Sequence, residues 1–353
     1  MVVHVRVRIV GAVAVLGLGA LALGGCTSSS GGSSSTSSTA TTGGASLQSN
    51  FESVIANVMP SVVLITLPSS LGSGIVLDSK GDIVTNNHVV AGATDYQVTL
   101  STSSKTYDAK LVNSFPQGDL AVIKMTDPPS DLKPATFADS SKSVVGQIVL
   151  AMGNPIGLSS SATDGIISAT GRTVTEPASS DTPAATLTDM IQTSASINSG
   201  NSGGALVDLS GAVVGIPTLT AVDQTLGGAH PGIGFAISSD TAKRIADQIV
   251  SSGKVTDSGL ASLGITGRSL IDANSRPVGV GVVQVTPGGP AANAGIVAGD
   301  VITSVNKVPV TSMDALSGEL ATLKPGQQVP VGITKADGST STVNVTLGTL
   351  SVS

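Results

Sequence analysis

The sequence predicts a mostly β chain that ends in a smaller α+β module. From Pro60 onward, short apolar runs recur about every ten residues and are separated by glycine, serine and asparagine turns. Aromatic residues make up only 2% of the chain, so the core must be built from Val, Ile, Leu and Ala. Many short strands at this spacing are typical of a β-barrel or a β-sandwich.

Length and charge limit the classes of protein to consider. The chain has 353 residues, which leaves room for roughly two folded domains and a tail. Its net charge is −6, and a chain without a basic stripe is poorly suited to bind the phosphates of nucleic acid. The His, Cys and carboxylate residues show no clustered metal-ligand spacing. We therefore expect no nucleic acid, no metal and no cofactor.

Residues 1–25 predict an export signal. Two arginines precede an uncharged apolar run of 15 residues, Ile9–Leu23, which is short for a membrane span of about 20 residues. The sequence Leu23-Gly24-Gly25-Cys26 resembles a bacterial lipobox, and this resemblance implies that Cys26 is lipidated. A single uncleaved N-terminal anchor and secretion are the alternatives. Cys26 is the only cysteine, so no intramolecular disulfide is expected.

The segment after Cys26 predicts a spacer. Residues 27–46 are almost wholly Ser, Thr, Gly and Ala, a composition typical of a flexible tether. We place the lipidated cysteine and linker at 26–50, the first folded domain at 51–253 and the second at 258–350. This arrangement predicts a protein that is lipid-anchored on the extracytoplasmic face of the membrane in a bacterial cell envelope.

A glycine-rich turn presents one serine. Residues 197–206 read Ile-Asn-Ser-Gly-Asn-Ser-Gly-Gly-Ala-Leu, and glycine allows backbone N–H groups to turn inward at such a place. A serine nucleophile needs an exposed Oγ and N–H groups that converge on the oxyanion, here those of Ser202 and Gly200. A small-residue β-turn in a Ser/Gly-rich chain is the alternative interpretation.

A base and an orienting acid lie earlier in the chain. Of the three histidines, His4 falls in the export signal and His230 in a Gly/Pro-rich loop. His88 follows a predicted strand directly and is the candidate base. Asp119 opens another strand and would accept the Nδ1–H of His88. Taken singly, a loop histidine with a backbone partner and an acid that caps a turn remain alternatives.

Taken together, these stretches resemble the HtrA family of trypsin-like serine proteases. The resemblance implies a chymotrypsin-like fold of two six-stranded β-barrels, built from strands at 60–145 and at 146–237, with a catalytic triad in the cleft between them. The matching segments are GSGIVL at 72–77, TNNHVV at 85–90, DLAVIK at 119–124, GNPIG at 153–157, IQT at 191–193, GNSGG at 200–204 and GIGFAI at 232–237.

The resemblance also implies a role for each residue of the site. Ser202 is the nucleophile, His88 is its base, and Asp119 orients the imidazole. Gly200, Asn201 and Ser202 form the oxyanion hole.

The expected S1 site and substrate strand carry no acidic residue. On the same resemblance, Ile197 lies in the S1 wall and residues 213–220 form the strand that pairs with the substrate. Thr218, Leu219 and Thr220 of that strand line the S1 side. Because no acidic residue falls there, we expect cleavage after a small or medium aliphatic residue. Pro217 stands where the family often has asparagine, and it suits only a ladder position that need not donate a hydrogen bond.

The oxyanion turn departs from the family pattern. The family usually has proline where this chain has Ser199, and aspartate where it has Ser194. We therefore expect a more pliable turn than is usual in the family. This departure keeps open a second function, that of a chaperone-like binding protein with a latent or weak protease site.

A helix closes the first domain, and a linker follows it. The spacing of Ala242, Ile245 and Ile249 predicts a closing helix over 239–252, with Gly253 as its stop. Residues 254–259 then read as a linker.

Residues 258–350 resemble a PDZ domain in the bacterial circular permutation. A PDZ groove binds an extended peptide by strand addition, and backbone N–H groups hold the terminal carboxylate. The resemblance implies that Leu263, Gly264 and Ile265 form the carboxylate loop, with Leu316 on the opposite wall; core packing is the alternative for Leu316. The matching segments are SLGI at 262–265, GVVQV at 281–285, PAANAG at 290–295 and GDVI at 299–302.

The sequence thus predicts a membrane-tethered serine endopeptidase of envelope protein quality control or stress signalling. Its expected partners are unfolded or regulatory proteins and peptides with exposed C-termini. The family resemblance implies a homotrimer formed through the start of the protease domain. Phe51, Val54, Ile55 and Val58 give this segment an amphipathic pattern compatible with that role.

Overall fold

The computed structural model describes residues 40–68, 71–93, 95–154, 161–176, 185–198, 200–223, 228–272 and 274–351. The export signal and Cys26 lie outside these residues, as does Ser199. The removal of the export signal, the lipidation of Cys26 and the spacer before residue 40 therefore stay predictions. Among the described residues, no helix is both long enough and apolar enough to cross a membrane.

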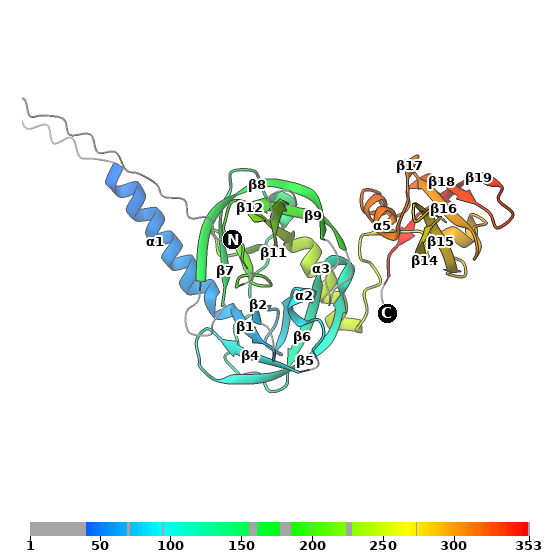
Figure 1. Ribbon diagram of the computed structural model, residues 1–353. Coiled ribbons are helices and arrows are strands. Elements are labelled where there is room, and N and C mark those ends of the chain that lie inside the picture. The colour runs from blue at the N-terminus through cyan, green and yellow to red at the C-terminus, as the bar shows by residue number, and fades with distance from the viewer. Residues whose placement is uncertain are drawn as a thin grey trace, which may run out of the picture. The chain divides into compact units, whose positions relative to one another are not determined.

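The first β-barrel consists of six antiparallel strands, blue to cyan in Figure 1. Their closed order is β1-β2-β3-β6-β5-β4. The sequence predicts strands at 82–85, 96–100 and 120–125, and the structure has all three with these bounds; the strand predicted at 109–113 is longer in the structure at both ends. The strands are β1 (Val62–Thr66), β2 (Leu71–Val76), β3 (Asp82–Thr85), β4 (Tyr96–Leu100), β5 (Thr106–Phe115) and β6 (Leu120–Met125).

The second barrel, green in Figure 1, also closes with six strands, in the order β10-β11-β12-β9-β8-β7. The prediction of two six-stranded barrels is therefore confirmed. The strands are β7 (Ile148–Gly153), β8 (Ser161–Glu176), β9 (Ala185–Thr193), β10 (Ala205–Asp208), β11 (Val213–Asp223) and β12 (Gly228–Ser238). A 3-10 turn, η3 (Ser140–Lys142), lies on the connection between the barrels.

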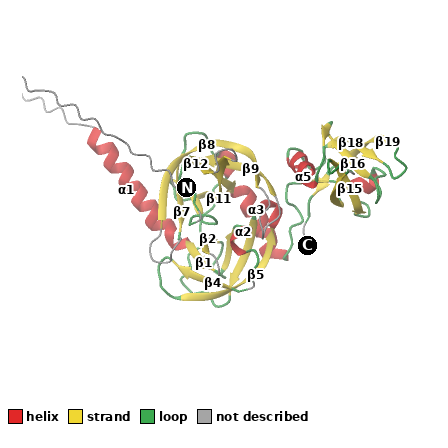
Figure 2. Ribbon diagram, in the orientation of Figure 1, coloured by secondary structure: helices red, strands yellow, loops and turns green. Residues whose placement is uncertain are grey.

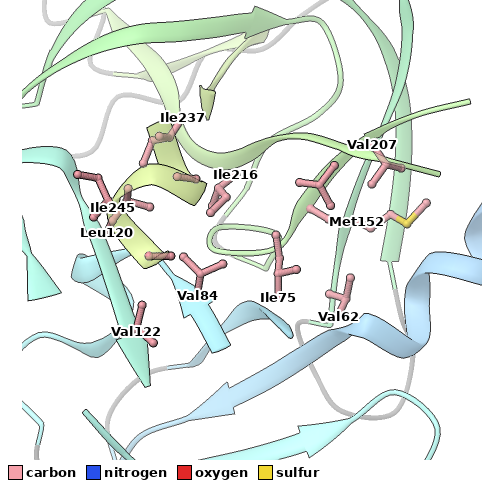
Figure 3. Packing of buried hydrophobic residues seen from close by; sticks show 14 of the residues in the cluster. Val62, Ile75, Val84, Leu120, Val122, Met152, Val207, Ile216, Ile237 and Ile245 are labelled. Carbon is pink, nitrogen blue, oxygen red and sulfur yellow. The ribbon is translucent and has the colours of Figure 1, made fainter. Parts of the chain in front are cut away.

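One buried cluster joins the two barrels. Figure 3 shows Val84 and Leu120 of the first barrel close to Ile216 of the second and to Ile245 of helix α3 (Ser239–Ser252), all four almost fully buried. Burying one such aliphatic side chain stabilises the fold by about 1.5–3 kcal/mol. Because side chains from both barrels fill this seam, the residues at its edge are held on a rigid base.

Helix α3 closes the seam as the sequence predicted. The Ser238 hydroxyl accepts a hydrogen bond from Thr241 N at 3.4 Å at the helix N-terminus. Ala242, Ile245 and Ile249 are buried, as expected for residues on one helical face. Gly253 ends the helix with φ of 68°, a left-handed conformation that favours glycine.

The N-terminal helix α1 (Ala40–Val58) differs from the prediction for its first half. The sequence predicted an irregular linker up to residue 50, but the helix begins at Ala40. Val54 and Val58 are buried against the barrels, and Phe51 and Ile55 pack beside them. Once this anchored part forms, adding further turns costs little free energy. A 3-10 turn, η1 (Met59–Ser61), leads into β1.

The C-terminal module combines a small sheet with two helices, and strands predominate in both barrels and in this module (Figure 2). Its main sheet has the order β14-β15-β16-β18-β19, so β14 is an edge strand. The short strand β17 (Val308–Pro309) pairs with β16, and β13 (Ala261–Ser262) pairs with β20 (Gly348–Thr349). The other elements are β14 (Ile265–Ile271), β15 (Pro277–Val285), β16 (Val301–Val305), β18 (Gln328–Thr334), β19 (Thr340–Thr346), α4 (Pro290–Asn293) and α5 (Met313–Ala321).

Candidate active site

The first barrel brings His88 and Asp119 together. His88 lies on the short helix α2 (Asn87–Val90) after β3, and Asp119 follows the 3-10 turn η2 (Pro116–Gly118) before β6. Nδ1 of His88 is 2.8 Å from Oδ2 of Asp119, and the backbone N–H of His88 donates to Oδ1 at 2.9 Å. The Asp119 side chain is 3% exposed and that of His88 is 29% exposed. A buried carboxylate thus orients an accessible imidazole.

The backbone of Asp119 is also held in place. Its φ of 49° lies in the left-handed region, which costs a non-glycine residue on the order of 1 kcal/mol or more. The N–H of Asn87 and the Nδ2 of Asn86 both donate to the Asp119 carbonyl, at 3.1 and 3.0 Å. Together with the two bonds from His88, four hydrogen bonds therefore fix the position and direction of this acid.

The turn that carries Ser202 lies directly on strand β7. A Cβ built at Gly153 would lie 2.5 Å from the Gly200 carbonyl oxygen, and one at Gly204 would lie 2.2 Å from the Met152 carbonyl oxygen. No side chain fits at either position, so the two backbones approach closely only because both residues are glycine. The apolar strand β10 begins at Ala205 and carries the turn into the second barrel.

In this conformation the nucleophile and its expected oxyanion donors are bound to Asn198. The Ser202 hydroxyl donates to the Asn198 carbonyl at 3.3 Å, so its single proton points there. The Ser202 N–H reaches the same carbonyl at 3.3 Å, and the Gly200 N–H reaches the Asn198 Oδ1 at 3.0 Å. The oxyanion hole expected from the sequence is therefore closed, because buried N–H groups need a partner and Asn198 supplies both acceptors.

Asn201 also differs from the sequence-based expectation. Its N–H donates to the Asn198 carbonyl at 3.1 Å, and its Nδ2 donates to the Ser196 carbonyl at 2.8 Å. Its Oδ1 accepts from the Asn198 N–H at 2.9 Å. All of these groups are used inside the turn, so Asn201 braces the turn rather than donating into the oxyanion hole.

Sequence reasoning missed Asn198. An asparagine two residues before a glycine is a signal for an Asx turn, in which the side-chain oxygen accepts from the N–H two residues further on. This is the bond that Asn198 makes to Gly200. This signal is present in the sequence. The prediction, however, aimed the N–H groups of Gly200 and Ser202 at the oxyanion and gave Asn198 no role.

Strand β11 reaches the site through Thr218. Thr218 is 4% exposed, and its hydroxyl donates to the Ile216 carbonyl at 3.0 Å and accepts from the Nδ2 of Asn86 at 2.9 Å. The carbonyl of Pro217 accepts from the Gly203 N–H at 2.9 Å. Pro217 thus occupies a position that uses its carbonyl, in agreement with the expectation that this position need not donate.

The expected S1 residues lie on neighbouring segments. Ile197 is 9% exposed, and a Cβ built at Gly234 would lie 2.3 Å from its Cγ1, so Ile197 packs directly on β12. Leu219 pairs with Phe235 and Thr220 with Gly234 in the β11–β12 ladder. The side chains of Leu219 and Thr220 lie outside the described part of the structure.

Comparison with known proteins finds similar proteases. A trypsin-like peptidase domain matches residues 72–216, and a PDZ domain matches residues 239–347. The periplasmic serine endoprotease DegP of Escherichia coli is 41% identical over 285 residues, which cover 79% of this chain and 57% of DegP. The serine protease PepD of Mycobacterium tuberculosis is 39% identical over 314 residues, covering 84% of this chain and 66% of PepD.

Solved structures decide the family. The serine endoprotease from Yersinia pestis is 34% identical with a TM-score of 0.55, and the match covers 85% of this chain and 98% of that chain. The HtrA-type protease AlgW, solved with a decapeptide, is 30% identical with a TM-score of 0.54, and the match covers 85% of this chain and 98% of AlgW. The chain belongs to the HtrA family. The chain spans only 57% of the length of DegP.

In this HtrA-family chain, the expected PDZ residues lie around one cavity. Leu263, Gly264, Ile265 and Leu316 line the same cavity, together with Met313. Gly264 has φ of 67°, and its N–H donates to the Ser262 hydroxyl at 3.0 Å. Leu263 and Leu316 are at most 2% exposed, so they also belong to the core of this domain. The core-packing alternative for Leu316 is thus compatible with its place in the cavity.

Proposed function

We propose that this HtrA-family chain is a serine endopeptidase whose triad is His88, Asp119 and Ser202. The observation that carries the proposal is the buried Asp119 carboxylate, 2.8 Å from Nδ1 of an accessible His88. This contact turns Nε2 of the imidazole away from the acid. The N–H of Ser73, on β2 beside β3, donates to the Ser202 carbonyl at 3.0 Å, which holds the nucleophile's turn against the barrel that carries the base.

The proposed mechanism follows from these roles. Ser202 Oγ attacks the scissile carbonyl carbon while Nε2 of His88 takes the hydroxyl proton. The imidazolium, stabilised by Asp119, then gives its proton to the leaving amine, and an acyl-enzyme forms. Water, deprotonated by the same imidazole, hydrolyses the acyl-enzyme. The N–H groups of Gly200 and Ser202 hold the oxyanion once Asn198 has released them.

The proposed substrates are unfolded or regulatory proteins cut after an aliphatic residue. Ile197, packed against Gly234, supplies an apolar S1 wall, which favours a small or medium aliphatic side chain. Sequencing the products of a degenerate peptide library measures this preference. A profile dominated by lysine and arginine would contradict it.

The PDZ domain is proposed to bind peptide C-termini at β14. Its edge position permits strand addition, and the loop Leu263–Ile265 lies at the start of that strand. AlgW has been solved with a tripeptide as well as with a decapeptide, which supports a peptide-binding role in the family.

A location in the bacterial cell envelope is proposed from the predicted export signal and lipobox. The name of DegP places that relative in the periplasm. At this location the protein is proposed to form a membrane-tethered homotrimer that acts in protein quality control or stress signalling. Fractionation of cells expressing the wild type and Cys26→Ser tests the anchor: the variant should leave the membrane fraction, and an unchanged distribution argues against lipidation.

A fluorophosphonate serine probe tests the proposed activity. The full-length protein is labelled with and without a peptide that ends in a hydrophobic residue. Labelling that is lost in Ser202→Ala but kept in Ser210→Ala, a change at an exposed serine, supports the nucleophile. Labelling that persists in Ser202→Ala contradicts the assignment. Labelling that needs the peptide identifies a latent enzyme activated through the PDZ domain.

A chaperone-like binding protein is the second candidate function. It is favoured by the closed turn, in which Asn198 occupies both expected oxyanion donors. Absence of labelling in both conditions, combined with suppressed aggregation of an unfolded client protein, would support this function over proteolysis.

A further inference from the structure

Ser73 is a fully buried polar residue beside the proposed active site. It lies on β2 in the segment Gly72-Ser73-Gly74, is 0% exposed, and has no place in the triad. A buried hydroxyl costs free energy unless its hydrogen bonds are made. The positions of its partners therefore indicate what this residue does.

Every polar group of Ser73 has a partner. Its hydroxyl donates to the Gly200 carbonyl at 2.8 Å and accepts from the Asn154 N–H at 2.9 Å. Its backbone N–H donates to the Ser202 carbonyl at 3.0 Å. Its own carbonyl accepts from the Thr85 hydroxyl at 2.6 Å. One residue of the first barrel thus binds three residues of the second.

Two of these partners flank Asn201 in the catalytic turn. Ser73 binds the carbonyls of Gly200 and Ser202, and so restrains the Gly200–Asn201 and Ser202–Gly203 peptide planes, which flank the plane that carries the Ser202 N–H. On its other side, the Gly200 carbonyl lies against Gly153, where no Cβ fits. This carbonyl is therefore confined between β2 and β7.

The bonds that close the oxyanion hole come from a different direction. They run from the N–H groups of Gly200 and Ser202 to Asn198. Opening the hole has to break these two bonds, but it need not disturb the carbonyls that Ser73 holds. The Asn198 side of the turn can therefore move while the Gly200–Ser202 side stays on the first barrel.

We propose that Ser73 is a positioning residue for the oxyanion hole. It clamps the carbonyls of Gly200 and Ser202, so that the N–H groups released by Asn198 keep their direction relative to Ser202 Oγ. Ser73 touches neither substrate nor base and acts only through the turn. This inference rests on the proposed endopeptidase function.

Alanine at position 73 tests the hydroxyl and keeps the backbone bond to Ser202. Ser239→Ala is the matched control, because Ser239 is also 0% exposed and its hydroxyl also donates to a backbone carbonyl, that of Ala138, at 2.8 Å. Ser73→Ala loses two buried hydrogen bonds, those with Gly200 and Asn154, and Ser239→Ala loses one, so both should lower Tm, Ser73→Ala by more. For each full-length protein we would measure Tm, kcat and KM on a peptide substrate, and the rate of fluorophosphonate labelling.

Ser73→Ala is expected to lower kcat by about tenfold to a hundredfold, the range that a misplacement of about 1 Å can cause. KM should change by less than about twofold, because the substrate-binding strand is untouched. The labelling rate should fall in parallel with kcat, since phosphonylation needs the same N–H groups. Ser239→Ala should leave all three kinetic values unchanged.

Three results would overturn the proposal. Ser73→Ala could retain kcat despite its loss of Tm, or both variants could lose kcat equally, which would make the role merely structural. If Ser73→Ala does not fold, Ser73→Cys replaces it: a thiol is a weaker donor, and an unchanged kcat would then be the contrary result. A wild-type chain that neither labels nor cleaves contradicts the proposed function as well, whereas an active wild type separates the two failures.

Discussion

At the level of single residues, buried uncharged polar side chains support the site around the Asp119 carboxylate. Asn86 is 0% exposed, yet its Nδ2 binds both the Asp119 carbonyl in the first barrel and Thr218 in the second. Among the residues that the structure describes, the Oδ1 of Asn86 and the Nδ2 of Asn154 have no hydrogen-bond partner. Unsatisfied buried groups cost stability and need an explanation. Asn86 holds Asp119, and Asn154 binds Ser73. The loss of stability therefore occurs at residues that position the site.

The contact between His88 and Asp119 yields a direct prediction. Asp119→Asn replaces the carboxylate with an amide of nearly the same shape, which no longer supplies two acceptor oxygens for the N–H and the Nδ1–H of His88. The wrong tautomer is then favoured, and we expect kcat to fall by about 10⁴-fold. Steady-state kinetics on a peptide substrate measure the loss, with Tm as the folding control. A loss below about tenfold would show that Asp119 does not orient the base.

At the element scale, short elements are held by side chains from neighbouring strands. Helix α2 has only four residues, too few to be stable alone. The hydroxyl of Tyr96, on β4, lies 2.8 Å from the Ala93 carbonyl and 3.2 Å from the Val90 carbonyl at the end of this helix. Tyr96 is 1% exposed. It therefore supports the helix that presents His88.

Tyr96 also predicts a loss of stability in alkali. Burial, and to a smaller extent the negative charge of Asp95, raise the pKa of Tyr96 above its ordinary value of 10.0. Above pH 10.0 the unfolded chain releases this proton before the folded chain does, so stability falls as pH rises towards the folded pKa. Below pH 10.0 the contribution of Tyr96 to stability is present in full.

Melting curves of the wild type and Tyr96→Phe at about pH 8 and about pH 11 test this linkage. At the lower pH the variant should be less stable, by about 1 kcal/mol for the lost hydrogen bond. At the higher pH the difference should shrink, since phenylalanine has no proton to lose. A difference that is the same at both pH values would refute the role of Tyr96.

Element bounds were predicted best where local signals are strong. Residues 239–252 form the expected helix because an apolar face, a serine cap and a glycine stop agree. The prediction of a linker was wrong over residues 40–50, which belong to helix α1. Composition alone suggests a tether there, whereas the anchored residues that follow extend the helix. Strand β5 runs further than predicted, since its pairing with β4 and β6 continues beyond the apolar segment.

At the scale of the whole molecule, the seam between the barrels determines the site. The cluster around Val84, Ile216 and Ile245 holds the barrels together, and the polar bonds of Ser73 and Asn86 cross at its edge. Catalytic geometry needs this rigidity, because a small displacement of the reacting groups is costly.

Removing residues 258–353 tests how the second domain affects this site. If the PDZ domain senses C-termini, its removal should abolish stimulation of labelling by peptide while basal labelling remains. The two labelling rates are measured on the full-length and shortened proteins, with Tm as the control that the shortened protein folds. Stimulation that persists after the deletion would place the peptide site elsewhere.

Local sequence patterns predict which residue types the site uses and how the chain is divided into domains. The order of His88, Asp119 and Ser202, the strand pattern and the glycine-rich turn are local signals, readable because each depends on neighbouring residues. The bonds from Ser73 and Asn86 to the opposite barrel follow only from the folded structure. These contacts join residues 127 and 132 positions apart in the chain. No local pattern encodes them, because packing of the two barrels creates the contact.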